Sequence, residues 1–170
     1  GGGGPIALGG LILHGSSLVA LTGTQPAVPA TWAFAPAGGW QGGVTNLEIY
    51  EASNPAHPVS RWRAAFDGHL LASRRIGERL FLALRHIPTV PGYQATFTPA
   101  TANRALLMNT PLDTFMPKVR INGGAATNAL AVSDFHLPPQ GGLAPTAEMT
   151  LLYEVDLAAA RIAGAIAVIG

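Results

Sequence analysis

The chain of 170 residues contains no cysteine. This absence excludes disulfide bonds, thiol nucleophiles and zinc sites built from thiolates. Charged residues make up only 11% of the chain, and the net charge is +1. Globular domains usually carry about a quarter of charged residues, and a domain that binds nucleic acid usually presents a strong positive field. We therefore expect no nucleic acid among its partners.

The chain also has no apolar run long enough to cross a bilayer. The strongest candidate, residues 157–170, has 14 residues and contains Arg161, whereas a membrane helix needs about 20. We therefore expect no membrane span. The glycine-rich opening lacks the Lys-Ser/Thr pair and the helix of a phosphate-binding loop. We interpret residues 1–10 as a linker.

Glycine, proline and apolar residues are abundant. The chain has 21 glycines, 14 prolines and 48% apolar residues. This composition favours many short strands joined by turns over long helices.

The most informative feature is a repeat. Gly15 and Gly77 each mark a tight turn between two apolar strands, 62 residues apart (77 minus 15). A Tyr-Glu pair follows each turn, at residues 50–51 and 153–154, 103 residues apart (153 minus 50). The difference of 41 residues (103 minus 62) is chain inserted into the second copy. Because repeated four-stranded units are typical of propellers, we predict an all-β fold: a partial β-propeller of two four-stranded antiparallel blades with a long loop insertion.

We place the first blade at residues 11–68 and the second at residues 69–170, with the insertion at about residues 87–147 lying over one rim. Within the insertion, residues 102–108 favour a short helix and residues 118–121 a short strand. Two blades leave broad apolar faces exposed, and a propeller usually has about four to eight blades. We therefore expect either a fragment of a larger propeller, with the remaining blades as partners, or self-association that completes one.

Two segments resemble a known family. They read LEIYEASNPAHP, residues 47–58, and FDGHLLASRRIGERLFL, residues 66–82. They are similar to the bacterial secreted proteins with a C-terminal β-propeller domain distantly related to WD repeats, and residues 111–124 resemble the long insertion of that family. The resemblance implies a propeller fold and a secreted, periplasmic or cell-surface location. Glu51 departs from the family pattern, in which Asp is usual.

Arginines are concentrated in the middle of the chain. Six of the ten basic residues are Arg61, Arg63, Arg74, Arg75, Arg79 and Arg85. Guanidinium groups suit carboxylates, sulfates and phosphates, so Arg61, Arg63, Arg74 and Arg75 are candidate binding residues for a protein or a polysaccharide. The alternative is that arginines on exposed strands deter aggregation. Ser73-Arg74, which matches the family pattern, is also expected to link the blades by hydrogen bonds.

Three tryptophans are the other candidates for recognition. Trp32 and Trp40 fall in a long loop over residues 23–43, where they either stack on sugar rings or cover the blade faces. Trp62 falls inside a strand and is expected in the core.

No catalytic set is identifiable. The chain has no Gly-x-Ser-x-Gly elbow, and Glu51 and Glu154 hold the same place in both copies, which favours a role in the repeat. Asp134 and His136 point the same way on an extended segment, but two ligands are too few for a metal site. We predict no metal and no cofactor.

The function that these patterns favour is a non-enzymatic exported module. It would serve as a structural scaffold or bind a protein or glycan, with the insertion as the preferred contact region, since long loops on rigid scaffolds often carry binding. The alternative is a hydrolase whose site lies at the propeller channel and is completed by blades absent from this chain.

Overall fold

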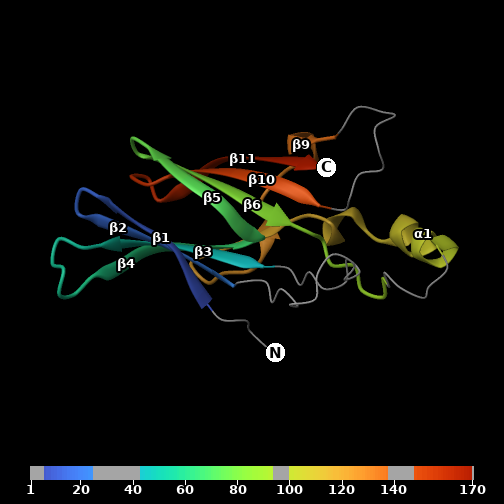
Figure 1. The fold of residues 1–170 in the computed structure, drawn as a ribbon, viewed down its shortest axis with the longest axis horizontal. Helices are drawn as coiled ribbons and strands as arrows, with labels where there is room; N and C mark the ends of the chain where they lie inside the picture. Colours follow the sequence, from blue (N-terminus) through green and yellow to red (C-terminus); the bar gives the residue numbers. More distant parts are fainter. Residues whose placement is uncertain (1–5, 25–42, 94–99, 138–147, 170) are drawn as a thin grey trace.

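Two β-sheets lie face to face in the computed structural model, which describes residues 6–24, 43–93, 100–137 and 148–169 (Figure 1). Each sheet contains one four-stranded antiparallel unit in which the strands follow the order of the sequence. The first blade consists of β1 (Ile6–His14), β2 (Ser17–Thr24), β3 (Val44–Glu51) and β4 (Val59–Asp67). The second blade consists of β5 (His69–Ile76), β6 (Arg79–His86), β10 (Met149–Asp156) and β11 (Arg161–Ile169).

The backbone conformation repeats at the same spacing as the sequence. Gly15 and Gly77 both have φ = 59° in the turns that join β1 to β2 and β5 to β6. The pairing of β1 with β2 shifts register between residues 8 and 10, and that of β5 with β6 shifts between residues 70 and 72. Both shifts are separated by 62 residues (70 minus 8, 72 minus 10), the spacing of the two glycines.

One strand begins earlier than the sequence predicts. β1 begins at Ile6, so residues 6–10 of the expected linker belong to the sheet, where they pair with the end of β2. The alanine-rich segment at residues 161–169 forms a strand, β11. This segment is a strand because its pairing with β10 satisfies its backbone hydrogen bonds.

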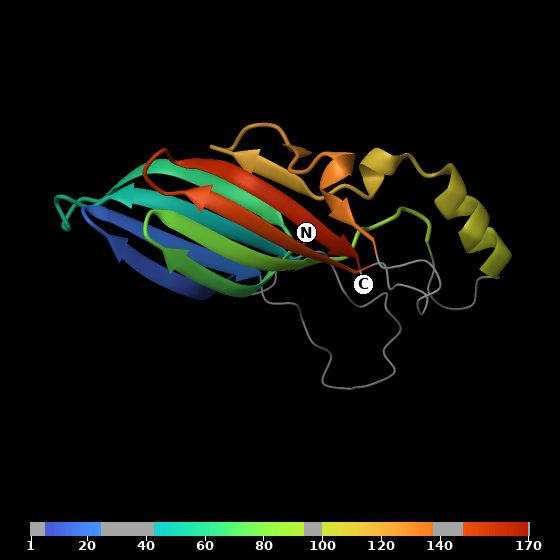
Figure 2. The same cartoon turned by 90° about the horizontal axis from the view of Figure 1, so that it is seen from above.

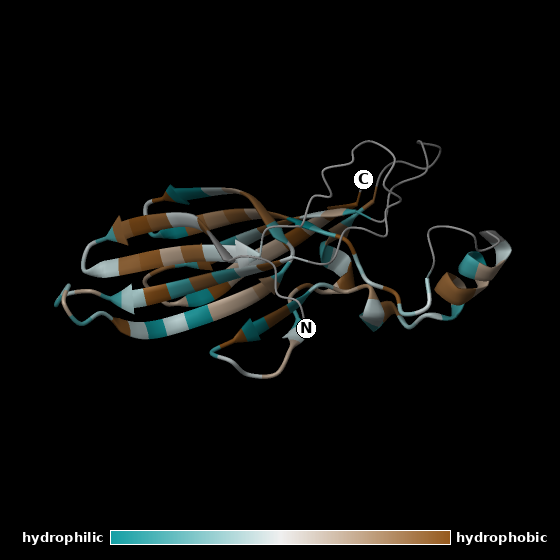
Figure 3. Ribbon diagram, turned by 60° about the horizontal axis from the view of Figure 1, so that its bottom comes forward, coloured by the Kyte–Doolittle hydropathy of each residue, from teal (hydrophilic) through white to brown (hydrophobic). Residues whose placement is uncertain are grey.

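The core lies between the two blades. Buried side chains alternate with more exposed ones along β2, β3, β6 and β10, so that one face of each blade is buried against the other (Figure 3). At the centre, the rings of Phe66 and Tyr153 approach to 4.7 Å between centroids. Trp62 is only 6% exposed, which confirms its predicted place in the core.

The insertion contains ordered elements. They are α1 (Ala100–Asn109), η2 (Leu112–Thr114), β7 (Lys118–Ile121), β8 (Thr127–Asn128), η3 (Val132–Asp134) and β9 (Phe135–His136). The predicted helix at residues 102–108 and strand at residues 118–121 are confirmed. Among the described residues, no helix has the length and apolar character needed to span a membrane.

Part of the insertion lies at one end of the two blades, as the sequence had suggested, but other parts of it run along the outer edges of both sheets. β7 pairs antiparallel with β4 and is followed in the sheet by β8, whereas β9 pairs in parallel with β11 (Figure 2). A single segment therefore adds strands to the outer edges of both blades. The physical reason is that β4 and β11 would otherwise present unpaired backbone groups at these edges.

Candidate functional site

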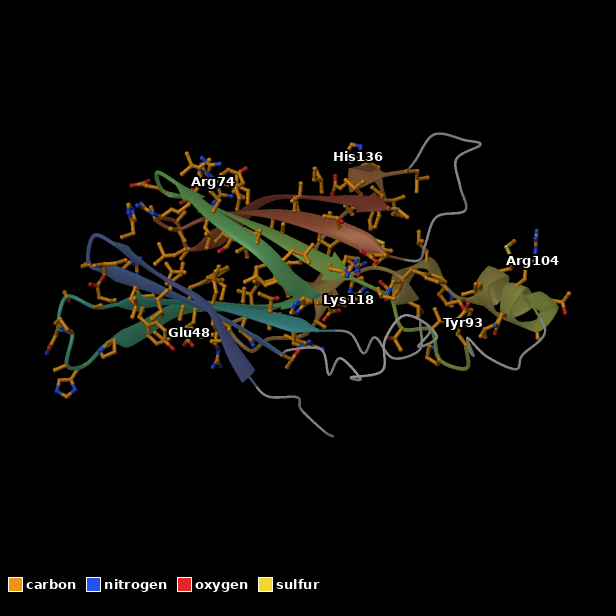
Figure 4. The ribbon with its side chains drawn as sticks, viewed as in Figure 1. Glu48, Arg74, Tyr93, Arg104, Lys118 and His136 are labelled. Atoms are coloured by element: carbon orange, nitrogen blue, oxygen red, sulfur yellow. The ribbon has the colours of Figure 1, made fainter. Side chains whose placement is uncertain are left out.

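The predicted arginine cluster is divided between the two sheets. Arg61 and Arg63 are exposed on β4 of the first blade, and Arg74 is exposed on β5 of the second. Figure 4 shows Arg74 and Glu48, a neighbour of Arg63 across the strands, on opposite outer faces of the molecule. The four candidate arginines therefore do not form one site, and their individual binding roles stay predictions.

The expected link between the blades is made by Arg75. Its Nη1 atom donates hydrogen bonds to Nδ1 of His14, at 3.0 Å, and to the carbonyl oxygen of Gly77, also at 3.0 Å. His14 ends β1 of the first blade. Arg74, for which the link was predicted, instead pairs opposite Phe81 on the outward face of the second blade, because alternate strand residues point in opposite directions.

Two other arginines are held in ion pairs on the second blade. Arg79 Nη1 lies 3.2 Å from Glu154 Oε1 and 3.3 Å from Asp156 Oδ2, and Arg85 pairs with Glu148. These pairs are partly exposed, so each contributes little to the free energy of unfolding. They fix charged side chains on either side of Phe81, on the outward face of the second blade.

The structure brings one further arginine beside Arg63. The pairing of β4 with β7 places Arg120 opposite Ala65, and both line a hollow of about 360 Å³ together with Arg63 and Glu48. Hydrogen bonds from Ser60 and Tyr50 lower the pKa of Glu48, and the charge of Arg63 adds to this effect. Nothing in the sequence pattern indicated Arg120, because only the sheet pairing of the insertion connects it to β4.

The remaining sequence candidates make no site in the described residues. Trp32 and Trp40 lie outside them. Asp134 Oδ2 accepts a hydrogen bond from the backbone N–H of Ala131, at 2.8 Å, and His136 is exposed in β9. Within residues 6–24, 43–93, 100–137 and 148–169, no group of three or more His, Cys, Asp or Glu side chains could hold a metal ion.

A cavity of about 370 Å³ lies where the insertion meets the ends of both blades. We call it the rim cavity. The blades line it with residues that include Val44, Asp67 and His86, and the insertion with residues that include Thr89, Thr114, Met116 and Lys118. Figure 4 shows Lys118 at this end of the two layers. The cavity falls within the usual size range of ligand pockets, about 300 to 1,000 Å³.

Asp67 is placed by the crossing from the first sheet to the second. Gly68 makes this crossing with φ = 126°, and a Cβ there would lie 3.1 Å from the carbonyl oxygen of Arg85. The backbone N–H of Gly68 donates to Gly43, at 2.7 Å, and its carbonyl accepts from the hydroxyl of Thr45, at 2.9 Å. These contacts hold the Asp67 carboxylate at the cavity wall.

The insertion is tied to this wall. Asp67 Oδ2 accepts a hydrogen bond from the backbone N–H of Lys118, at 3.0 Å. The Nζ atom of Lys118 lies 2.8 Å from Asp113 Oδ1, which also accepts from Asn128 Nδ2 at 2.9 Å. The hydrogen bond from Lys118, and then that from Asn128, lowers the pKa of Asp113. The lysine and aspartate therefore form a charge-neutral part of the wall.

His86 and Tyr153 lie in the electric field of Asp67. His86 ends β6 and is 8% exposed; burial lowers its pKa, against the opposing effect of the Asp67 charge. Burial, and then the same charge, raises the pKa of Tyr153. His86 Nδ1 and the Tyr153 hydroxyl are buried and have no hydrogen-bond partner in the described part of the chain. No sequence pattern connects His86 with Asp67, because the two residues lie on different strands of different sheets.

Comparison with known proteins gives one result. A family model described as Beta propeller domain matches residues 5–170. No curated protein and no solved structure matches the chain.

Proposed function

The chain belongs to the Beta propeller domain family, and we propose that it is an exported, non-enzymatic module that holds a protein or glycan partner on a propeller scaffold. The family confirms the predicted fold class, so the two four-stranded units are propeller blades. Support for export comes from the resemblance of residues 47–58 and 66–82 to secreted bacterial proteins.

The observation that carries this proposal is the rim cavity. It is the place where both blades and the insertion, three separate parts of the sequence, line one hollow. Its walls are fixed by the hydrogen bond from the backbone N–H of Lys118 to Asp67 and by the ion pair of the Lys118 side chain with Asp113. A site on a rigid scaffold loses less conformational entropy when it binds than a mobile loop does.

The chemistry of the cavity favours a glycan over a protein segment. Hydroxyl groups of Thr89 and Thr114 both donate and accept hydrogen bonds, and the carboxylate of Asp67 accepts them. Val44 and Met116 add apolar surface between these groups. A sugar ring has the matching pattern, because its hydroxyl groups both donate and accept while its C–H groups are apolar.

Calorimetric titration with neutral hexose oligosaccharides tests the proposal. We expect saturable binding, with a dissociation constant that rises about three- to tenfold in Thr89→Val, because one hydrogen bond is lost. Thr101→Val on the exposed helix α1 is the matched control and should leave the affinity unchanged.

Three results would contradict parts of the proposal. Absence of binding to every oligosaccharide, together with saturable binding of a peptide library, would favour a protein partner. Binding that Thr89→Val leaves unchanged would move the site away from the rim cavity. Release of new reducing ends during the titration would show a hydrolase and overturn the non-enzymatic role.

A further inference from the structure

The outward face of the second blade is apolar although nothing in the described chain covers it. Its exposed apolar side chains come from three neighbouring strands of the sheet: Phe81 on β6, Leu152 on β10, and Ile166 and Val168 on β11. These four side chains are between 39% and 42% exposed. The register pairs Leu152 with Ile166 and places Phe81 opposite Glu154, so all belong to one face.

The repeat identifies this face with one that is buried. Residue 81 holds the place of Val19 (81 minus 62), and residue 152 holds the place of Ile49 (152 minus 103). Leu152 pairs with Ile166 as Ile49 pairs with Trp62. Val19 and Ile49 are fully buried, and Trp62 is 6% exposed, because the second blade covers them. The outward face of the second blade is therefore the repeat equivalent of an interface between blades.

The same chain carries a second exposed apolar stripe, on the opposite side of the molecule. Leu8, Leu11 and Leu13 of β1 are 58% to 69% exposed. Leu11 and Leu13 pair with Ala20 and Leu18, which point away from the core, so the stripe lies on the outward face of the first blade.

The contact between the two blades shows how the stripes would meet. β5 of the second blade lies against β2 and β3 of the first. β1 holds the place of β5 in the repeat, and β6 and β10 hold the places of β2 and β3. Repeating the observed contact once more therefore sets β1 of one molecule against β6 and β10 of another. This places the leucine stripe over Phe81 and Leu152.

We propose that a second copy of this chain covers the face, in a head-to-tail contact in which the leucine stripe of one molecule packs on the second blade of the next. Such a heterologous contact repeats until a ring closes. Because propellers have about four to eight blades and the described residues of each copy form two, a closed ring contains about two to four copies. The inference is independent of the rim cavity, which lies at the blade ends rather than on either outward face.

Solution mass and a complementation experiment test the contact. The full chain should change from 17.5 kDa to two to four times that mass as its concentration rises through roughly 1 to 100 µM. Leu152→Glu and Leu11→Glu each place a charge in one half of the contact. Either variant alone should remain at 17.5 kDa. Mixed together they should form a one-to-one pair of 35 kDa (twice 17.5), because each retains the half that the other lacks.

Matched variants separate this result from misfolding. Met108→Glu, on the 78% exposed side chain of α1, should assemble like the wild type. Val168→Glu and Leu13→Glu should repeat the results of the first two variants, and all variants should keep the wild-type far-UV dichroism.

A wild type that stays at 17.5 kDa throughout the concentration range would overturn the proposal and leave the face to a different partner. Assembly of Leu11→Glu alone, with no new species in the mixture, would also overturn it, in favour of a symmetric contact through the second blade.

Discussion

Ile49 and Leu152 occupy the same place in the two copies of the repeat, yet one is fully buried and the other is 41% exposed. Both are aliphatic residues on the third strand of their blade, and both point to the same side of the repeat. The difference in burial comes from the neighbouring sheet. The first blade has the second blade against that side, whereas the second blade has no described neighbour there.

This comparison shows what an apolar strand pattern reports. The pattern records that a face is suited to burial, and it does so equally in both copies. It does not record which sheet buries the face. Burial of apolar surface stabilises by about 25 cal/mol per Å² removed from water. Within the described chain this stabilisation is obtained for that face of the first blade, whereas for the same face of the second blade it is available only when a partner binds.

The largest expected difference between the copies concerns side-chain truncation. Ile49→Ala should lower the free energy of unfolding by about 2 to 5 kcal/mol, because it leaves a cavity in a packed core. Leu152→Ala, at the equivalent place, should cost less than about 1 kcal/mol for the isolated chain, because its side chain is partly solvated. Urea unfolding at low protein concentration measures both. Equal losses would show that the outward face is already covered in the single chain.

Glycine substitutions sharpen the comparison at the turns. Gly15→Ala and Gly77→Ala should each lower the free energy of unfolding by about 1 to 2 kcal/mol, because both residues have φ = 59°, which strains a residue with a Cβ. No atom lies within 4 Å of an added Cβ at either position, so no steric contact adds to this cost. The two costs should be the same, since the hairpins repeat.

Gly68→Ala provides the contrasting case within the same series. It combines strain of roughly 1 to 3 kcal/mol with a contact of 3.1 Å to the Arg85 carbonyl, so it should cost more than either hairpin change. Thermal unfolding of the three variants gives the order. A smaller loss at Gly68 would mean that the crossing between blades is not tightly packed.

The smallest expected effect concerns pH. Burial lowers the pKa of His86 below its ordinary value of 6.5, so the unfolded chain binds a proton there before the folded chain does. Stability from this residue is fully present above pH 6.5 and is lost as the pH falls through the lowered pKa. His86→Leu should therefore reduce the slope of stability against pH below 6.5. The control His57→Leu, in an exposed turn, should leave this slope unchanged, and an equal effect of both variants would contradict the assignment to His86.

Much of the fold follows from local features of the sequence. The glycines at 15 and 77 predict the two hairpins, since a positive φ favours glycine. The short apolar strands and their repeat predict two antiparallel blades, and Trp62 is in the core as expected. The helix and the strand predicted within the insertion are also present.

The candidate sites were much less predictable. The rim cavity depends on Asp67, His86 and Lys118, which are far apart in the sequence and meet only because the insertion returns to β4. Arg120 joins Arg63 for the same reason. The link between blades was assigned to Ser73-Arg74 but is made by Arg75, the next residue, and a shift of one residue in a strand moves the side chain to the opposite face.

The sequence by itself determined the strands, the turns and the side of each blade that is suited to burial, because these depend on backbone conformation and on the period of apolar residues. The tertiary structure decided which blade face is covered, which edges the insertion completes, and which polar side chains meet at the rim. These outcomes depend on pairings between residues that are distant in the chain, and no local pattern encodes such a pairing.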